Sequence, residues 1–370
     1  MKDRATLFLC GDVMTGRGID QTLPCPGDPT LHEPCIGNAT DYVNLAERVS
    51  GPIGRGVKFS CIWGDGLDEF HREMPRIKII NLETAITRSE TYWETKDIHY
   101  RMSPENIGCL TAAGINCCVL ANNHMLDWGV TGLLDTLDAL DQAGIKHAGA
   151  GRHLRDARTP AILDIGAGMR VIVFSLGSTS SGIPLAWSAE EKRPGLNLIE
   201  TQSKDPIRAL ARGIDEVKRE GDIVIISIHW GGNWGYKISP AQKNFAHRLV
   251  DETGMSILHG HSSHHVKAID VYKERLILYG CGDFLNDYEG IGGYEGFRGD
   301  LGLMYFADVM PSTGQLLALR MIPTQIRRFR INHASEGDAK WLETLLNRKG
   351  QHFGTRVQRS AENILTLQWK

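Results

Sequence analysis

The sequence predicts a layered α/β fold, and three observations support this prediction. Apolar segments with the length of buried strands recur along the chain, and segments with helical patterns stand between them. The composition, with 42% hydrophobic and 23% charged residues, is ordinary for a folded globular protein. At 370 residues the chain exceeds the usual length of one domain, so we expect one large unit or a domain with insertions.

The predicted strands are recognised by apolarity that is continuous rather than alternating. Such continuity is expected of strands that are covered on both faces. Seven segments have it, and they span residues 6–12, 77–83, 115–123, 170–177, 222–231, 255–261 and 276–284. We therefore expect these segments to form the centre of the fold, with helices on its faces.

The predicted helices begin at capping sites. Ser103, Asp205 and Ser239 each precede a proline, an order that is typical of helix N-termini. Residues 131–143 carry leucines with helical spacing and are followed by Gly144, which is typical of a helix end. Strands that alternate with helices favour the α/β class.

Residues 21–68 interrupt this alternation with segments rich in proline and glycine and with one predicted helix near 41–49. We divide the chain into a domain at residues 1–335, which contains this insertion, and a C-terminal helix and tail at residues 336–370. The insertion is either a lid over a site or a surface excursion without a role, and the sequence favours neither.

Net charge and hydropathy argue against two classes of partner, nucleic acid and membrane. A formal net charge of −3 gives no reason to expect nucleic acid as a partner, because such binding favours a concentrated basic face. The apolar run before Gly11 has about five residues, too few for the core of a signal peptide or for a membrane span. We therefore expect a cytoplasmic protein without a membrane anchor in this chain; the oligomeric state stays open.

Polar side chains stand at the ends of almost all predicted strands. Because ligands of open α/β sheets collect at the carboxyl ends of strands, we expect these side chains to converge. They are Asp12, Glu83, Asn123, His124, His229, His261, His264, His265 and Asp283. Carboxylates, amide oxygens and imidazoles suit a divalent cation such as Mn, Fe or Zn, and a site richer in oxygen suits Ca or Mg. The identity of the metal stays open.

The motifs at these positions carry a family resemblance. In order, they are GDVMTGR (11–17), NLETAIT (81–87), ANNHMLDWG (121–129), HWGGNWGY (229–236), GHSSHHV (260–266) and YGCGDFLND (279–287). Together they resemble the CapA/PgsA family, which is associated with poly-γ-glutamate capsule synthesis. The resemblance implies a calcineurin-like metallophosphatase fold, a four-layer αββα sandwich with a metal centre at its loops, for residues 1–335.

Carried over position by position, the resemblance also implies roles for individual residues. His124 matches the histidine that works beside the metal, and Asp127 is placed to orient it. The metal ligands it implies are Asp12, Glu83, Asn123, His229, His261 and His264.

Three positions depart from the family pattern. Met14 stands where metallophosphatases usually have a histidine ligand, so we expect one tightly bound ion rather than two. Asn233 replaces the usual acid of its motif, and Asp283 replaces the usual asparagine and adds a carboxylate.

Three functions are compatible with the sequence. The first is metal-dependent acid/base chemistry on a peptide or glutamyl substrate, namely epimerisation at Cα. In it, His124 with Asp127 forms one acid/base pair, and His265 or His264 with Asp12 or Asp283 forms the other. The second is hydrolysis of a phosphoester or a γ-glutamyl amide. The third is a non-catalytic accessory role in polymer synthesis. Epimerisation is slightly preferred, because Met14 weakens the two-ion arrangement that phosphoester hydrolysis exploits.

Overall fold

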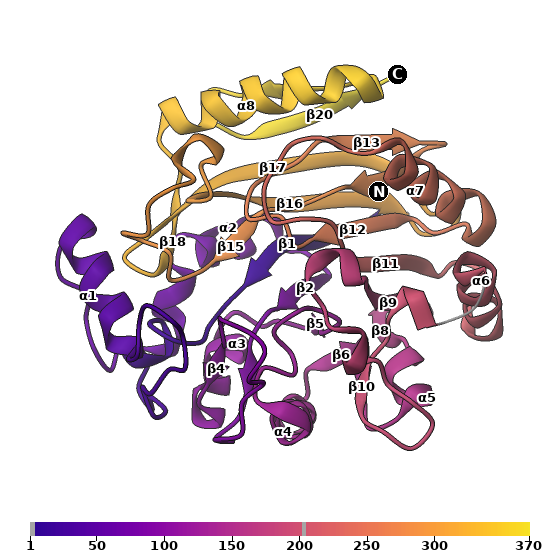
Figure 1. The fold of residues 1–370 in the computed structure, drawn as a ribbon. Coiled ribbons are helices and arrows are strands. Elements are labelled where there is room, and N and C mark those ends of the chain that lie inside the picture. Colours follow the sequence, from indigo (N-terminus) through magenta and orange to yellow (C-terminus); the bar gives the residue numbers. More distant parts are fainter. Residues whose placement is uncertain (1–3, 202–204) are drawn as a thin grey trace.

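The structure is a computed structural model that describes residues 4–201 and 205–370. Two β-sheets form its centre (Figure 1). Within the described residues the larger sheet has ten strands, in the order β19-β20-β17-β16-β1-β2-β5-β6, with β15 beside β1 and β18 beside β17. Their bounds are β1 (Ala5–Val13), β2 (Ile77–Leu82), β5 (Cys117–Val119), β6 (Lys146–Ala148), β15 (Asp283–Leu285), β16 (Leu301–Met310), β17 (Gln315–Arg327), β18 (Arg330–His333), β19 (Thr355–Arg359) and β20 (Leu365–Trp369).

The smaller sheet has the order β13-β14-β12-β11-β9-β8. Its central strands β9, β11, β12 and β14 are parallel to one another, and β8 and β13 are antiparallel edge strands. Their bounds are β8 (Ala161–Gly166), β9 (Met169–Gly177), β11 (Ile223–His229), β12 (Ile257–His261), β13 (Ile269–Tyr272) and β14 (Arg275–Leu278). Two short pairs lie outside both sheets, β3 (Ala85–Ile86) with β4 (Arg101–Met102) and β7 (Ala150–Gly151) with β10 (Gly195–Leu196).

Helices cover the outer face of each sheet. One apolar core joins the larger sheet to α1 (Ala39–Ser50), α2 (Gly66–Glu73), α3 (Gly108–Ala112) and α4 (Gly129–Gln142). A second core joins the smaller sheet to α6 (Pro206–Val217) and α7 (Pro240–Thr253), which lie at the right of Figure 1. The two remaining helices are α5 (Leu154–Arg158) and α8 (Glu336–Gly350), the second of which packs beside β19 and β20.

The inner faces of the two sheets share a third apolar core. Strand β1 shows the reason: Leu7 and Leu9 point into the core between the sheets, whereas Phe8 and Cys10 point toward the helices on the outer face. A strand buried on both faces must be apolar at every position, which is the pattern seen in the sequence. The predicted α/β class and the four-layer αββα sandwich are thereby confirmed.

The capping predictions hold at two of three sites. The side chain of Asp205 accepts a hydrogen bond from the backbone of Arg208, and that of Ser239 accepts one from Gln242, at the starts of α6 and α7. Ser103 instead donates its hydroxyl to Glu105 and precedes a short 3-10 helix.

The C-terminal segment contains more structure than its sequence suggested. The helix expected after residue 336 is α8, but the end predicted to be polar tail forms the hairpin of β19 and β20, which extends the larger sheet beside β17. Only alternate residues of these strands are buried, such as Val357, Leu365 and Leu367. The continuous apolarity that marks strands buried on both faces is therefore absent from β19 and β20, so this pattern does not predict them.

The insertion at residues 21–68 contains α1, close to the helix predicted near 41–49, and Trp63 of this insertion is fully buried in the outer core. The buried guanidinium of Arg17 contacts Glu33 and Tyr42 of the insertion and pairs with Asp287, 2.5 Å away. The insertion is thus packed against the body of the fold, and a role as a lid stays a prediction. In the described part of the chain no helix combines the length and apolarity that crossing a membrane requires.

Candidate metal centre

Strands from both sheets end at one edge of the sandwich. The parallel register makes Asp12 on β1 the Cα partner of both Asn81 on β2 and Asp283 on β15, and it pairs His229 on β11 with His261 on β12. These strands lie next to one another near the centre of Figure 1. Side chains that are far apart in sequence therefore meet in one buried cluster, as expected of the carboxyl ends of parallel strands.

Two carboxylates of the cluster are held by one amide. The side-chain nitrogen of Asn81 donates to Asp12 Oδ1 at 2.7 Å and to Glu83 Oε2 at 3.0 Å, and the backbone N–H of Ser262 donates to Asp12 Oδ2 at 3.2 Å. Burial, together with the nearby carboxylate of Asp283, raises the pKa of Asp12 to about 7. Burial and the charge of Asp12 also raise the pKa of Glu83 well above its usual value. Without a cation, this concentration of buried negative charge is unfavourable.

Two imidazoles face each other across the cluster. The Nδ1 atoms of His229 and His261 are 2.7 Å apart, and His261 Nδ1 lies 3.8 Å from Asp12 Oδ1. His229 Nε2 lies 2.9 Å from the side-chain oxygen of Asn123, which brings that amide to the cluster. Burial lowers the pKa of both histidines well below the usual value, with smaller contributions from neighbouring imidazoles, so both rings are neutral.

The hydrogen-bond partners assign the protons of these neutral rings. His229 Nε2 donates to Asn123, which leaves Nδ1 without a proton. His259 Nε2 donates to the main-chain oxygen of Cys10, so its Nδ1 accepts from the hydroxyl of Ser227, and that hydroxyl oxygen accepts from His261 Nε2. The Nδ1 lone pairs of His229 and His261 therefore point at one another beside a carboxylate. This donor arrangement fits a divalent cation.

An imidazole–carboxylate pair, His264 with Asp283, lies next to Asp12. His264 Nδ1 donates to Asp283 Oδ1 at 2.9 Å, and the side-chain nitrogen of Asn286 donates to Asp283 Oδ2 at 2.7 Å. Burial acts to lower the pKa of His264, but the charge and hydrogen bond of Asp283 together with the charge of Asp12 outweigh it and raise the pKa. The rings of Trp234 and Tyr288 each lie 5.4 Å from the His264 ring, so aromatic side chains flank this pair.

Two groups of side chains in this cluster are close enough to bind metal ions. The first consists of Asp12, His229 and His261, and the second of Asp12, His264 and Asp283; the ligand atoms within each group lie within 4.8 Å of one another. Asp12 is common to both. Met14, because of which we expected one ion from the sequence, is fully buried and belongs to neither group. The structure offers two ligand groups, and the second contains His264 and Asp283, which the sequence had suggested as an acid/base pair.

His124 lies beside the cluster and is held by Asp127. Its Nδ1 donates to Asp127 Oδ2 at 2.6 Å, and its Nε2 lies 3.7 Å from Glu83 Oε1. Burial, and then the charge of Lys96, lowers the pKa of His124 to about 4. Burial acts to raise the pKa of Asp127, but Lys96 and His124 outweigh it and lower that pKa. The geometry is that of an imidazole oriented by a carboxylate.

His265 lies among backbone and aromatic groups, and its acid/base role stays a prediction. Its Nε2 accepts from the backbone N–H of Gly235 at 3.1 Å, and its Nδ1 donates to the main-chain oxygen of Val266 at 3.2 Å. Its ring packs against Tyr236 and Phe297. Both ring nitrogens are thus engaged by backbone groups, and His264 is the imidazole of this segment that faces the carboxylates.

Several residues of the cluster were not predicted from the sequence. Asn81 and His259 could have been found from their spacing, because Asn81 stands two positions before Glu83, which follows β2, and His259 stands two positions before His261 on β12. No sequence pattern predicts that Lys96 belongs to the cluster, because it lies in a loop. Its Nζ nevertheless donates to Asp127 Oδ1 and to the main-chain oxygen of Asn123.

A cavity of about 540 Å³ opens beside the second ligand group. Trp234, Asn286 and Tyr288 belong both to its lining and to the surroundings of His264 and Asp283. Its remaining lining comes from the end of α1 and from residues 289–300 and 325–327. None of the ligands themselves lines the cavity, so these three residues form its border with the cluster.

Comparisons with known proteins point to one family. The family model described as bacterial capsule synthesis protein PGA_cap matches residues 6–288. A probable polyglutamine synthesis accessory protein of Mycobacterium tuberculosis is 45% identical over 366 residues, which are 99% of this chain and 96% of the relative. The capsule biosynthesis protein CapA of Bacillus anthracis is 32% identical over 77% of this chain and 60% of its own length.

A solved structure also aligns with most of the chain. The NAD nucleotidase of Haemophilus influenzae aligns with 92% of this chain at 11% identity and a TM-score of 0.44. The chain spans 55% of the length of that nucleotidase.

Proposed function

This chain belongs to the bacterial capsule synthesis protein PGA_cap family, and from that premise we propose that it is a divalent-metal-dependent hydrolase acting on a glutamyl polymer or peptide. The substrate class rests on the relatives, whose names refer to capsule, polyglutamine and PGA synthesis. The reaction rests on the geometry of the cluster.

The observation that carries the proposal is that Asp12 belongs to two ligand groups. One group adds His229 and His261, and the other adds His264 and Asp283. A carboxylate shared by two neighbouring ligand groups is suited to a pair of ions a few ångströms apart, an arrangement that hydrolases use to clamp a reacting centre. Divalent ions bound there would lower the pKa of water and polarise a carbonyl or phosphoryl group.

The residues of the chain supply the rest of the chemistry. His124, held at Nδ1 by Asp127, presents an unprotonated Nε2 toward the cluster, where it can take a proton from the attacking water and pass it to the leaving amine or alkoxide. Lys96 holds Asp127 from the other side and so fixes the orientation of the pair. The cavity beside Trp234 and Tyr288 receives the remainder of the substrate.

Epimerisation at Cα is the second candidate, and a separate observation favours it. Two imidazole–carboxylate pairs, His124 with Asp127 and His264 with Asp283, lie at different sides of the cluster. Opposed acid/base groups of this kind can remove a proton from one face of a carbon and return one to the other. We rank this reaction second, because His265 is engaged by backbone groups and His264 also belongs to a ligand group.

Isotope labelling tests the proposal. Metal-loaded protein is incubated with γ-glutamyl oligopeptides and with a phosphoester, in parallel samples of H₂¹⁸O and D₂O. Hydrolysis incorporates ¹⁸O into a new carboxylate or phosphate and leaves Cα unlabelled. Deuterium at Cα without cleavage overturns hydrolysis in favour of epimerisation, and no turnover of any substrate overturns both in favour of the accessory role.

A further inference from the structure

A second cavity, with a volume of about 480 Å³, lies away from the metal ligands. It is formed where the segment before α7, the start of α7 and the residues after α8 meet. Tyr236 and Phe353 are its aromatic walls, and Lys237, Lys243, Lys349 and His352 surround them. No acidic residue lines it.

Two lysines of this cavity face aromatic rings rather than carboxylates. Among residues 4–201 and 205–370, none of the three lysines forms an ion pair with a carboxylate. Instead, Lys243 Nζ lies 5.0 Å from the centre of the Phe353 ring, and Lys349 Nζ lies 4.7 Å from that of Tyr236. Burial and the neighbouring charge of Arg348 lower the pKa of Lys349, as expected when cations are gathered without counter-charge.

Aromatic side chains connect this cavity to the metal cluster. Tyr236 contacts the His265 ring at 4.4 Å and the Phe297 ring at 5.3 Å. Trp234 contacts Phe297 at 5.4 Å and the His264 ring at the same distance. Aromatic rings therefore link the cavity to His264 of the cluster.

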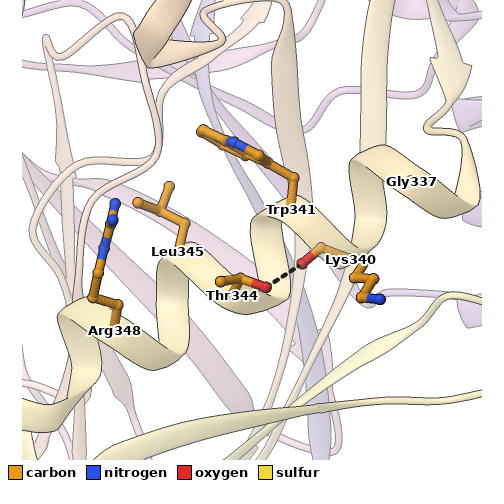
Figure 2. Close-up of a pocket in the computed structure, with 6 residues that line it drawn as sticks. All are labelled: Gly337, Lys340, Trp341, Thr344, Leu345 and Arg348. Atoms are coloured by element: carbon orange, nitrogen blue, oxygen red, sulfur yellow. Dashed lines mark hydrogen bonds between the residues drawn. The ribbon is translucent and has the colours of Figure 1, made fainter.

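The surface of α8 prolongs the basic region. Figure 2 shows Trp341, Leu345 and Arg348 projecting from the same side of this helix, where they line a hollow of about 320 Å³. Arg348 lines this hollow and Lys349, the next residue, lines the second cavity, so the end of α8 contributes one cation to each. We call the region formed by Tyr236, Lys237, Lys243, Arg348, Lys349 and Phe353 the basic groove.

We propose that the basic groove binds the carboxylates of an acidic polypeptide and thereby holds a polymer while one of its units occupies the metal cluster. The inference rests on the proposed function for the nature of the polymer. Unpaired lysines at a partly apolar surface attract a chain that carries both carboxylates and methylene groups. Nucleic acid fits less well, because the protein carries a net charge of −3.

A binding experiment with paired variants tests the inference. The probe is a fluorescein-labelled oligo-γ-glutamate of about ten residues, which is long enough to contact more than one lysine at once. Its binding is followed by fluorescence anisotropy at several salt concentrations. We expect the Lys243→Gln/Lys349→Gln variant to bind at least about tenfold more weakly than the unmodified protein, with a shallower dependence on salt.

The matched control is Lys146→Gln/Lys192→Gln, which removes the same charge from exposed positions outside the groove. Equal weakening by both double variants, or tighter binding of an oligothymidylate of the same charge, overturns the inference. Circular dichroism verifies that both variants are folded. The Asp12→Asn variant separates the two hypotheses: it should lose turnover, and the probe binding that it retains should still be weakened by Lys243→Gln/Lys349→Gln.

The outcomes are distinguishable. If short glutamyl substrates are hydrolysed but the probe does not bind, the basic groove is wrong and the proposed function stands. If the probe binds through Lys243 and Lys349 but no substrate is turned over, the proposed function is wrong and the basic groove stands.

Discussion

Asp12 and Asp283 are direct Cα partners in the parallel pairing of β1 with β15, although most of the chain separates them in sequence. Both carboxylates are fully buried, and both belong to the ligand group that contains His264. Two buried acids at this separation repel each other unless a cation or a proton lies between them. The pairing of these strands thus creates the need for a cation or a proton at the site.

The first prediction concerns metal content. Because Asp12 is shared, Asp12→Asn should reduce bound metal to near zero, whereas His229→Ala and His264→Ala should each remove about one ion per chain. Elemental analysis after gel filtration measures this. His147→Gln, which changes an imidazole outside the cluster, is the matched control and should keep all metal. An Asp12→Asn protein with its full metal content would show that other residues bind the ions.

The second prediction separates the roles of two histidines. His124→Ala should lower kcat by about 10²- to 10⁴-fold while metal content is retained, because His124 is expected to transfer protons rather than bind the ion. His265→Phe should change kcat little, since the ring packs among Tyr236 and Phe297. Steady-state kinetics together with metal analysis measures both. Loss of turnover in folded, metal-bound His265→Phe would restore the acid/base role predicted for this residue from the sequence.

The third prediction concerns Lys96 as a positioning residue. Lys96→Met should lower kcat by about 10- to 100-fold with little change in KM, because Asp127 loses the cation that holds it and His124 loses its fixed orientation. Lys96→Arg should restore part of the rate, since it retains a positive charge. If Lys96→Met instead raises KM alone, Lys96 contacts the substrate and does not act through Asp127.

The fourth prediction concerns stability. Arg17→Met should reduce the free energy of unfolding by about 3–5 kcal/mol, because it leaves the carboxylates of Asp287 and Glu33 buried without their cation. Urea denaturation measures the change. Arg88→Met removes an arginine from an exposed pair with Glu105 and is the control, for which we expect no measurable change. Equal effects of the two substitutions would mean that the buried pair adds nothing to stability.

The sequence determined much of the fold because its central strands are buried on both faces. All seven predicted strand segments contain strands of the structure, and β1 shows how continuous apolarity follows from its two covered faces. The hairpin of β19 and β20 was missed, because only alternate residues such as Leu365 and Leu367 are buried there. One-sided burial leaves a weaker signal in the sequence.

The sequence also determined which residue types stand at the strand ends, since parallel strands carry their ends to a common edge. Only the tertiary structure decided how these side chains combine. The pairing of β1 with β15 brings Asp283 to Asp12, the backbone of Gly235 and Val266 engages His265 and leaves His264 facing the carboxylates, and a loop delivers Lys96 to Asp127. In each case the distance in space between the contacting segments depends on how whole sheets and loops pack. Local sequence patterns fix the direction of a side chain along its own strand, but they do not encode which distant partner it meets.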